Sequence, residues 1–349
     1  MTLPLLPRRG ALALGLAAPF IANAQAQAGE VIVRNPGGAY DDTMRRFVYE
    51  PFTRATGIRV TAVAATAARL LAMFRSGNVE LDVIDGGDSI LEQLRRQNAL
   101  AEVDYGSWRL TRPEDVAPAV KFPTRVGNLL YASVIGYSKT AFPNGHPTNW
   151  AEFWDTTRFP GPRTLADMAT GAPNLEFALL ADGVPMDRLY PLDLERAFRS
   201  LDRIRRSVPK FWDTGALSAQ MLADREVVLG SFWNGRVQVL IDRGAPLGID
   251  WGQAMLEVQA VGIFRGARNA ANAQRLIDFM MQPAVQAEYC RELTYGPTNN
   301  QTFPLLAADQ LARMPGSPTS RERGFYKDID WWEDNRAAVN RRWSRWILG

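Results

Sequence analysis

Short runs of apolar, β-branched residues alternate with amphipathic segments from residue 30 onward. In the first third of the chain, apolar residues spaced three and four apart follow each run, as on one face of a helix. An alternation of strands and helices is typical of a layered α/β fold, in which helices cover a sheet. The pattern predicts strands at 31–35, 58–65 and 81–87, followed by helices at 37–57, 69–77 and 89–97.

The middle of the chain begins with a longer expected strand, from about residue 128 to 138. The stretch 143–164 that follows is rich in Pro, Gly and Trp and carries no clear period. Regular patterns then return up to the C-terminus. They predict a helix at 192–206, a strand at 227–235, a helix at 236–244, a strand pair around 247–251 and 258–266, a helix at 269–281 and a Trp-rich helical tail at 325–349.

The first 28 residues have the pattern of a secretory leader. Arg8 and Arg9 precede the apolar run "GALALGLAAPFI", and overlapping Ala-x-Ala sites end at Ala24, Ala26 and Ala28. A membrane anchor is the alternative, but the apolar run is interrupted by Pro19 and falls short of the roughly 20 residues that span a bilayer. We therefore expect export to the periplasm, by the Sec or the twin-arginine route.

Composition narrows the function classes. A chain of 349 residues with 46% hydrophobic content can form more than one core, which indicates two domains. The formal charge of +3 becomes about +1 without Arg8 and Arg9, so nothing indicates nucleic-acid binding. With His146 and Cys290 the only residues of their kinds, we expect no metal, no cofactor and no catalytic triad. An exported hydrolase that uses carboxylates is the remaining enzyme alternative.

A large aromatic residue stands directly after the strand in "VVLGSFWNGR". Trp233 precedes the turn Asn234-Gly235 and the next helix, so its indole can face a ligand site at the end of the sheet, with Asn234 and Arg236 as further candidates beside it. The alternative is a core Trp beneath that helix. An aromatic wall suits methylenes and a positive group, whereas Arg236 would repel a cation if it faced the same site.

Two post-strand loops in the first third offer further candidates. "NPGGAY" places Gly37, Gly38 and Tyr40 at a helix start, where backbone groups can approach a ligand, although a plain tight turn explains it equally. "VIDGGDS" offers Asp85 just past a strand and Asp88 at a helix start. Asp85 is the better carboxylate candidate, since Asp88 also fits as the N-cap of its helix.

The order of these segments resembles the periplasmic solute-binding receptors of bacterial ABC importers, specifically the polyamine (spermidine/putrescine) type. The resemblance covers nearly all of the chain after the leader. It is carried by "PFTRATGIRV", "LDVIDGG", "NWAEFWD", "EVVLGSFWNGR", "ANAQRLIDFMMQPAVQ" and "YGPTN", in this order.

That resemblance implies a type II clamshell with two α/β lobes and a ligand cleft between them. Lobe 1 would take residues 29–134 and 262–300, and lobe 2 would take 138–258 and 301–349, with hinges near 133–138 and 261–266. Tyr295 and Thr298 would lie on a loop that closes the cleft. The protein would be a monomer and no enzyme, and would deliver a small ligand to an inner-membrane permease or to a membrane sensor.

The sequence departs from the polyamine pattern in "MLEVQAVGI". Glu257 and Gln259 stand about where such receptors have a Trp and an Asp. A diamine needs a carboxylate at each end, because a buried unpaired ammonium is costly, and Asp85 and Glu257 could serve. The resemblance favours a polyamine or related amine. With Arg34 and Arg236 near the same cleft, an amino acid derivative, an opine or an organic anion is the alternative.

Overall fold

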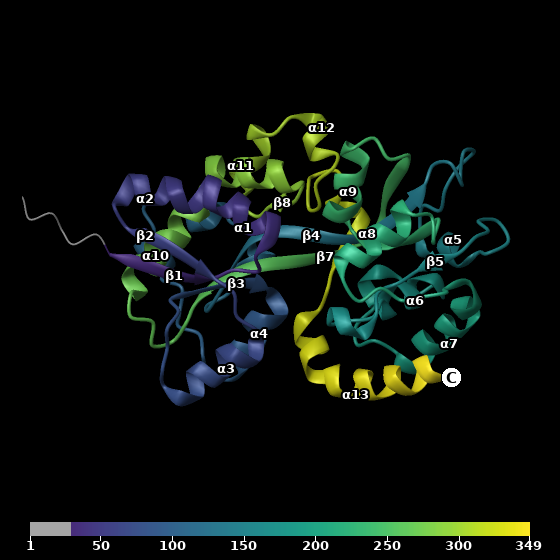
Figure 1. Cartoon of the computed structure of the whole chain (residues 1–349), viewed down its shortest axis with the longest axis horizontal. Helices are drawn as coiled ribbons and strands as arrows, with labels where there is room; N and C mark the ends of the chain where they lie inside the picture. The colour runs from purple at the N-terminus through teal and green to yellow at the C-terminus, as the bar shows by residue number, and fades with distance from the viewer. Residues whose placement is uncertain (1–28) are drawn as a thin grey trace, which may run out of the picture.

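Two long strands, β4 (Val126–Ser138) and β7 (Leu247–Ile263), run antiparallel through both halves of the molecule (Figure 1). The computed structural model describes residues 29–349, so the expected leader lies outside the described residues. One mixed sheet has the order β2-β1-β3-β7-β4-β6-β5, with β8 added to β4 and β9 to β7. The other strands are β1 (Glu30–Arg34), β2 (Arg59–Val63), β3 (Val83–Gly87), β5 (Arg163–Thr164), β6 (Leu229–Trp233), β8 (Gly296–Pro297) and β9 (Gly324–Tyr326).

The first lobe surrounds the parallel strands β2, β1 and β3 with helices on both faces (Figure 1). The helix expected over 37–57 forms with one π-helical turn at Arg45–Tyr49 and ends at Gly57, whose φ of 73° suits a glycine. Buried aliphatic and aromatic residues fill the space on each side of the sheet. The helices are α1 (Gly38–Met44), α2 (Glu50–Thr56), α3 (Ala67–Ser76), α4 (Asp88–Arg96), α10 (Ala270–Met280) and α11 (Pro283–Leu293).

The second lobe is built around β6, β5 and the other ends of β4 and β7. Its core is rich in aromatic residues, which explains why the Pro- and Trp-rich stretch had no readable period. Trp150 is fully buried, with its ring stacked 3.7 Å from that of Phe177. The helices are α5 (Trp150–Trp154), α6 (Leu175–Ala181), α7 (Leu194–Ile204), α8 (Gly215–Ala223) and α9 (Asn234–Asp242).

The strand pair expected around 247–251 and 258–266 is a single strand. β7 is continuous, but residues 251–254 bulge out, because Ser133 of β4 pairs with Met255 and Ile135 pairs with Asp250. The second crossing between lobes also differs from the expected 261–266. Val261 lies in the core of the first lobe and Met255 in that of the second, so β7 crosses between these two residues.

The C-terminal helix α13 (Ile329–Leu348) lies along the second lobe and reaches α4 of the first (Figure 1). Asp328 caps it, and Trp332, Val339 and Trp343 bury one face against the second core. Leu306 and Met314, on a segment expected in the second lobe, pack in the first core instead, around the short helix α12 (Ala308–Leu311).

Trp150→Ala should lower the free energy of unfolding by about 3 to 5 kcal/mol, because it removes a fully buried ring. Urea unfolding followed by circular dichroism measures this change. Leu305→Ala is the control, since Leu305 is 50% exposed and its truncation should cost below about 1 kcal/mol. Equal costs for the two variants would show that the stacked aromatic core is not what stabilises this lobe.

Candidate functional site

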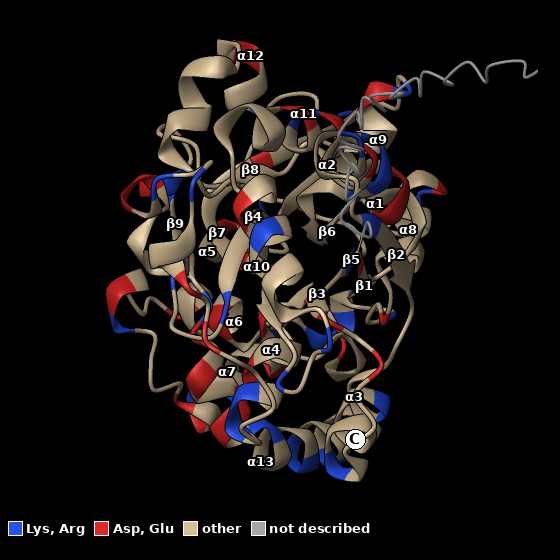
Figure 2. Cartoon of the chain, turned by 90° about the vertical axis from the view of Figure 1, so that its left-hand side faces the viewer, with Lys and Arg blue, Asp and Glu red and all other residues tan. Residues whose placement is uncertain are grey.

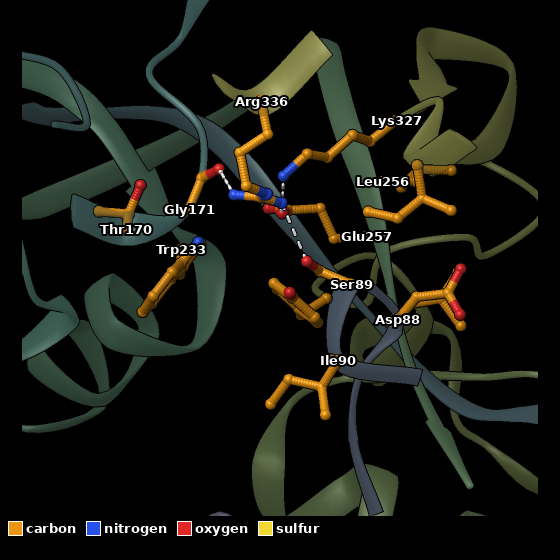
Figure 3. Close-up of a pocket in the computed structure, with 14 residues that line it drawn as sticks. Asp88, Ser89, Ile90, Thr170, Gly171, Trp233, Leu256, Glu257, Lys327 and Arg336 are labelled. Atoms are coloured by element: carbon orange, nitrogen blue, oxygen red, sulfur yellow. Dashed lines mark hydrogen bonds and ion pairs between the residues drawn. The ribbon is translucent and has the colours of Figure 1, made fainter. Parts of the chain in front are cut away.

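A cleft of roughly 270 Å³ opens where the two lobes meet, at the end of β6 and beside the β4/β7 crossing (Figure 3). The first lobe contributes the junction of β3 with α4, and the second contributes the ends of β6 and η5 (Met168–Thr170). The segment between β9 and α13 also borders it. The lining comprises residues 87–90, Tyr131, 170–171, Trp233, 256–258, Lys327, Ile329 and Arg336.

Trp233 forms an aromatic wall of this cleft. It is the last residue of β6, and α9 begins directly after it, so its side chain leaves the sheet at the strand end. Its ring meets that of Trp212 edge-on at 5.2 Å and that of Tyr131 at 6.2 Å. The half-buried Trp233 is therefore both packed from behind and open to the cleft.

Asp88 lines the cleft but does not cap α4 as the sequence suggested. It is the first residue of that helix, Gly87 is the N-cap, and no side chain caps it. The Asp88 carboxylate instead accepts hydrogen bonds from the buried guanidinium of Arg125, which also lies 3.3 Å from Glu92. Burial raises the pKa of Asp88 above its ordinary value, although the Arg125 hydrogen bond lowers it in part. The counter-ion of Asp88 is thus Arg125, within the first lobe.

Glu257 reaches the cleft from the crossing part of β7. Its Oε2 accepts a hydrogen bond from Ser133 Oγ at 3.0 Å, and its Oε1 lies 3.3 Å from Lys327 Nζ. Both charged side chains are nearly buried, with 10% and 12% of their surfaces exposed. The sequence pointed to Glu257 but not to Lys327, which follows β9 in the C-terminal segment.

Arg336 brings a second cation from α13 (Figure 3). Its guanidinium donates to Ser89 Oγ at 2.9 Å and to the carbonyl oxygen of Gly171, and it pairs with Glu333. Ser89 in turn donates to Glu333 Oε1 at 2.6 Å. This group therefore ties α4 of the first lobe to α13 and η5 of the second.

Asp85, Tyr40 and Gln259 come together, but in the interior of the first lobe rather than on the cleft lining. Asp85 is fully buried and accepts hydrogen bonds from Tyr40 Oη at 2.8 Å and from Gln259 Nε2 at 2.7 Å. Burial raises the pKa of Asp85 to about 7, against the lowering effects of the Gln259 and Tyr40 hydrogen bonds. Burial likewise raises the pKa of Tyr40.

Asn234 and Thr298 hold the backbone together. The Asn234 amide accepts from the backbone N–H of Ala132 at 3.0 Å and donates to the Thr294 carbonyl at 2.9 Å, which ties α9 to the crossing strand. Thr298 is buried and donates to the Gly127 carbonyl at 2.7 Å. Asn234 thus bonds to main chain on both sides, while the Thr298 hydroxyl also accepts from Gln286 Nε2 at 3.0 Å.

The other expected residues are not part of the cleft lining. Tyr295 sits behind Tyr131, with ring centroids 6.3 Å apart, and against Gly235 at the start of α9. Arg236 is exposed on α9. Gly37 and Gly38 have positive φ values of 85° and 64°, which fit the tight turn before α1.

Charge on the rest of the molecule is mixed. Both acidic and basic positions are seen around α7 and α13 in the turned view of Figure 2. Among residues 29–349, no cluster of three or more His, Cys, Asp or Glu side chains could hold a metal ion. No helix within residues 29–349 has the length and hydrophobicity needed to cross a membrane.

Comparison with known proteins gives a consistent set of relatives. Residues 48–315 match the family described as bacterial extracellular solute-binding protein. A gamma-aminobutyric acid-binding protein from Pseudomonas aeruginosa is 30% identical over 334 residues, which cover 94% of this chain and 93% of that protein. A spermidine/putrescine-binding periplasmic protein from Escherichia coli K12 is 24% identical over 299 residues, covering 80% and 82%. The crystal structure of an ABC transporter substrate-binding protein from Bradyrhizobium japonicum USDA 110 superposes with a TM-score of 0.84 at 29% identity, covering 91% of this chain and 99% of that one.

The titration of Asp85 should appear in the pH dependence of stability. Its folded-state pKa of about 7 lies above the ordinary 3.8, so its stabilising contribution is complete below about pH 4 and is lost as the pH rises to about 7. Relative to Asp85→Asn, the wild type should lose a few kcal/mol over this range, since one pKa unit corresponds to about 1.4 kcal/mol.

Urea unfolding of both proteins at pH 4, 6 and 8 measures this difference. Asp42→Asn, which removes an exposed carboxylate from α1, controls for the change in net charge. A constant difference between wild type and Asp85→Asn across the range would mean that Asp85 keeps one protonation state.

Proposed function

The chain belongs to the family of bacterial extracellular solute-binding proteins, and on this premise we propose that it is the periplasmic receptor of an ABC importer for a small zwitterion. The proposed ligand is an amino acid derivative in which a short apolar chain separates an ammonium from a carboxylate. Its relatives are solute-binding receptors. This receptor would bind its ligand without chemistry.

The observation that carries the proposal is the charge balance of the cleft. Its lining holds two acids, Asp88 and Glu257, and two bases, Lys327 and Arg336. The acids and bases already have counter-ions, either each other or Arg125 and Glu333 just behind the lining. A zwitterion adds no net charge to this arrangement, so every ionic group can keep a partner when water is excluded.

A polyamine fits the same cleft less well. It would bring at least two ammonium groups into a lining whose net charge is zero, and each uncompensated buried charge costs several kcal/mol. The similarity to spermidine/putrescine-binding proteins, at 24% identity, extends over less of the chain than the similarity to the gamma-aminobutyric acid-binding protein. The latter name itself describes a zwitterion of the proposed kind.

The aromatic wall supplies the apolar part of recognition. Trp233 and Tyr131 present ring surfaces to the cleft, which suits the methylenes of a short chain and attracts an ammonium over a ring face. Glu257 lies in the same lining and can accept the ammonium, while Lys327 and Arg336 can donate to the carboxylate.

Binding would couple to the movement of the lobes. The junction of β3 and α4 lies on the first lobe, whereas Trp233, Lys327 and Arg336 lie on the second. A ligand that contacts both sides favours the closed arrangement by its higher affinity for that state. The closed monomer would then present both lobes to an inner-membrane permease, after export directed by the leader.

A ligand screen tests the proposal directly. Thermal-shift and calorimetric titrations of the chain from Gly29 onward should show stabilisation by zwitterions such as 4-aminobutanoate, by about 2.7 kcal/mol at a concentration of 100 times Kd. Opines, organic anions, putrescine and spermidine complete the panel. Stabilisation by the diamines alone would contradict the proposal and restore the polyamine assignment.

Trp233→Ala should weaken zwitterion binding by at least about tenfold, or about 1.4 kcal/mol, with a small change in Tm because the side chain is only half-buried. Calorimetry gives Kd and differential scanning fluorimetry gives Tm. Trp212→Ala is the matched control. Trp212 is 1% exposed and should lose about 3 to 5 kcal/mol of stability. A collapse of Tm in Trp233→Ala as large as that in the control would identify Trp233 as a core residue.

A further inference from the structure

Lys327 pairs with Glu257 and also lines the cleft, where a ligand can contact it. We infer that Lys327 is the specificity-determining residue of the cleft, because its ammonium offsets the charge of Glu257 and favours a carboxylate over a second ammonium at the other end of the ligand. The inference rests on the proposed function and deepens it, since it names the group that makes the cleft bind zwitterions in preference to diamines. Three sets of contacts support it.

The backbone of Lys327 is fixed beside its partner. Its N–H donates to the carbonyl oxygen of Leu256 at 3.1 Å, one residue before Glu257 on β7. Its Nζ lies 3.3 Å from Glu257 Oε1, and its side chain is only 12% exposed. Because its main chain and its side chain both contact the same stretch of β7, Lys327 is held in a fixed position in the cleft lining.

A second acid lies behind Lys327. This acid is Glu176. Lys327 Nζ is 5.6 Å from the ring centre of Trp332, and Trp332 Nε1 donates to Glu176 Oε1 at 2.6 Å. Glu176 is fully buried, and among the described residues its Oε2 has no hydrogen-bond partner. Burial raises the pKa of Glu176 above its ordinary value, although the Tyr190 hydrogen bond and the charge of Lys327 offset part of this rise. Lys327 therefore lies between two acidic side chains, Glu257 beside it and Glu176 behind the Trp332 ring.

These contacts set the charge that a ligand meets. An ammonium has three donors, so Lys327 can keep its bond to Glu257 and still donate to a ligand carboxylate. A ligand ammonium can share Glu257 only if the other end of the ligand does not add a further positive charge. A diamine would place two cations near Lys327 and Arg336, and juxtaposed like charges cost several kcal/mol.

Two ligands with the same number of carbons separate the effect of end-group charge from the effect of chain length. 4-Aminobutanoate and putrescine both have four carbons and one common ammonium, and they differ in the carboxylate or ammonium at the other end. Calorimetric titration of each against wild type and Lys327→Met gives the ratio of the putrescine Kd to the 4-aminobutanoate Kd. Methionine retains an apolar stem against Trp332 and removes the ammonium with its charge and its donors.

We expect this ratio to fall at least about tenfold in Lys327→Met, because the variant loses a repulsive cation and a carboxylate donor together. Lys327→Arg should keep the wild-type preference within about threefold, since it keeps the charge. Lys139→Met removes an exposed lysine of the second lobe and should leave the ratio unchanged. A wild-type ratio in Lys327→Met would overturn the inference.

A folding defect of Lys327→Met is addressed by a second variant. Loss of Lys327 leaves the buried Glu176 without its nearby cation, so Glu176→Gln combined with Lys327→Met removes the acid together with the lysine. The same fall in the Kd ratio is expected in this double variant, and an unchanged ratio there overturns the inference as well.

The wild-type titrations distinguish the two proposals. If wild type binds 4-aminobutanoate or another zwitterion of the panel and Lys327→Met keeps the ratio, the role of Lys327 fails and the proposed function stands. If wild type binds only diamines, or no zwitterion at all, the proposed function fails first and the inference with it.

Discussion

The antiparallel ladder between β4 and β7 is the constraint on which the rest of the structure depends. These two strands belong to both lobes, so their register fixes which residues of one lobe face the other. Tyr131 pairs with Glu257 directly at the crossing, and the bulge at residues 251–254 lies just beyond it. A shift of one residue in this register would turn Glu257 to the opposite face of the sheet and remove the acid from the cleft. β6 then pairs with β4 from Ser133 onward, which places Trp233 beside the same crossing.

The C-terminal segment completes the site that the ladder begins. β9 pairs with β7 through Leu256, and α13 buries Trp332 and Trp343 against the second lobe. This docking carries Lys327 and Arg336 to a cleft whose other charged lining residues are acids. Hydrophobic burial of the helix thus holds two cations where water is scarce, at a position where each has a carboxylate partner. The net charge of the lining therefore depends on the packing of aromatic residues of α13 that do not themselves line the cleft.

Three of the residues that the sequence singled out lie on the lining of the cleft. Trp233 ends β6 and Asp88 follows β3, whereas Glu257 lies within β7 at the crossing. Residues at strand ends reach a cleft with little dependence on distant packing. Asp85 also follows a strand pattern, yet Tyr40 and Gln259 cover it, and it becomes a buried acid of the first lobe. Asn234 and Thr298 were expected at the ligand but bond to main chain instead. Whether a polar residue faces a ligand or its own backbone depends on neighbours that no local pattern contains.

The sequence by itself determined the α/β class, the positions of most helices and strands and the family, because apolar periodicity and turn residues act locally and the motif order spans the chain. The type II two-lobe fold that the resemblance implied is confirmed. Only the tertiary structure decided that 247–263 is one strand and that β7 crosses between Met255 and Val261. It also placed Lys327 against Glu257, about 70 residues apart in the chain. The physical reason is that charge pairing between distant segments follows from how helices and strands dock, and docking is set by side-chain packing over the whole core rather than by any local run of residues.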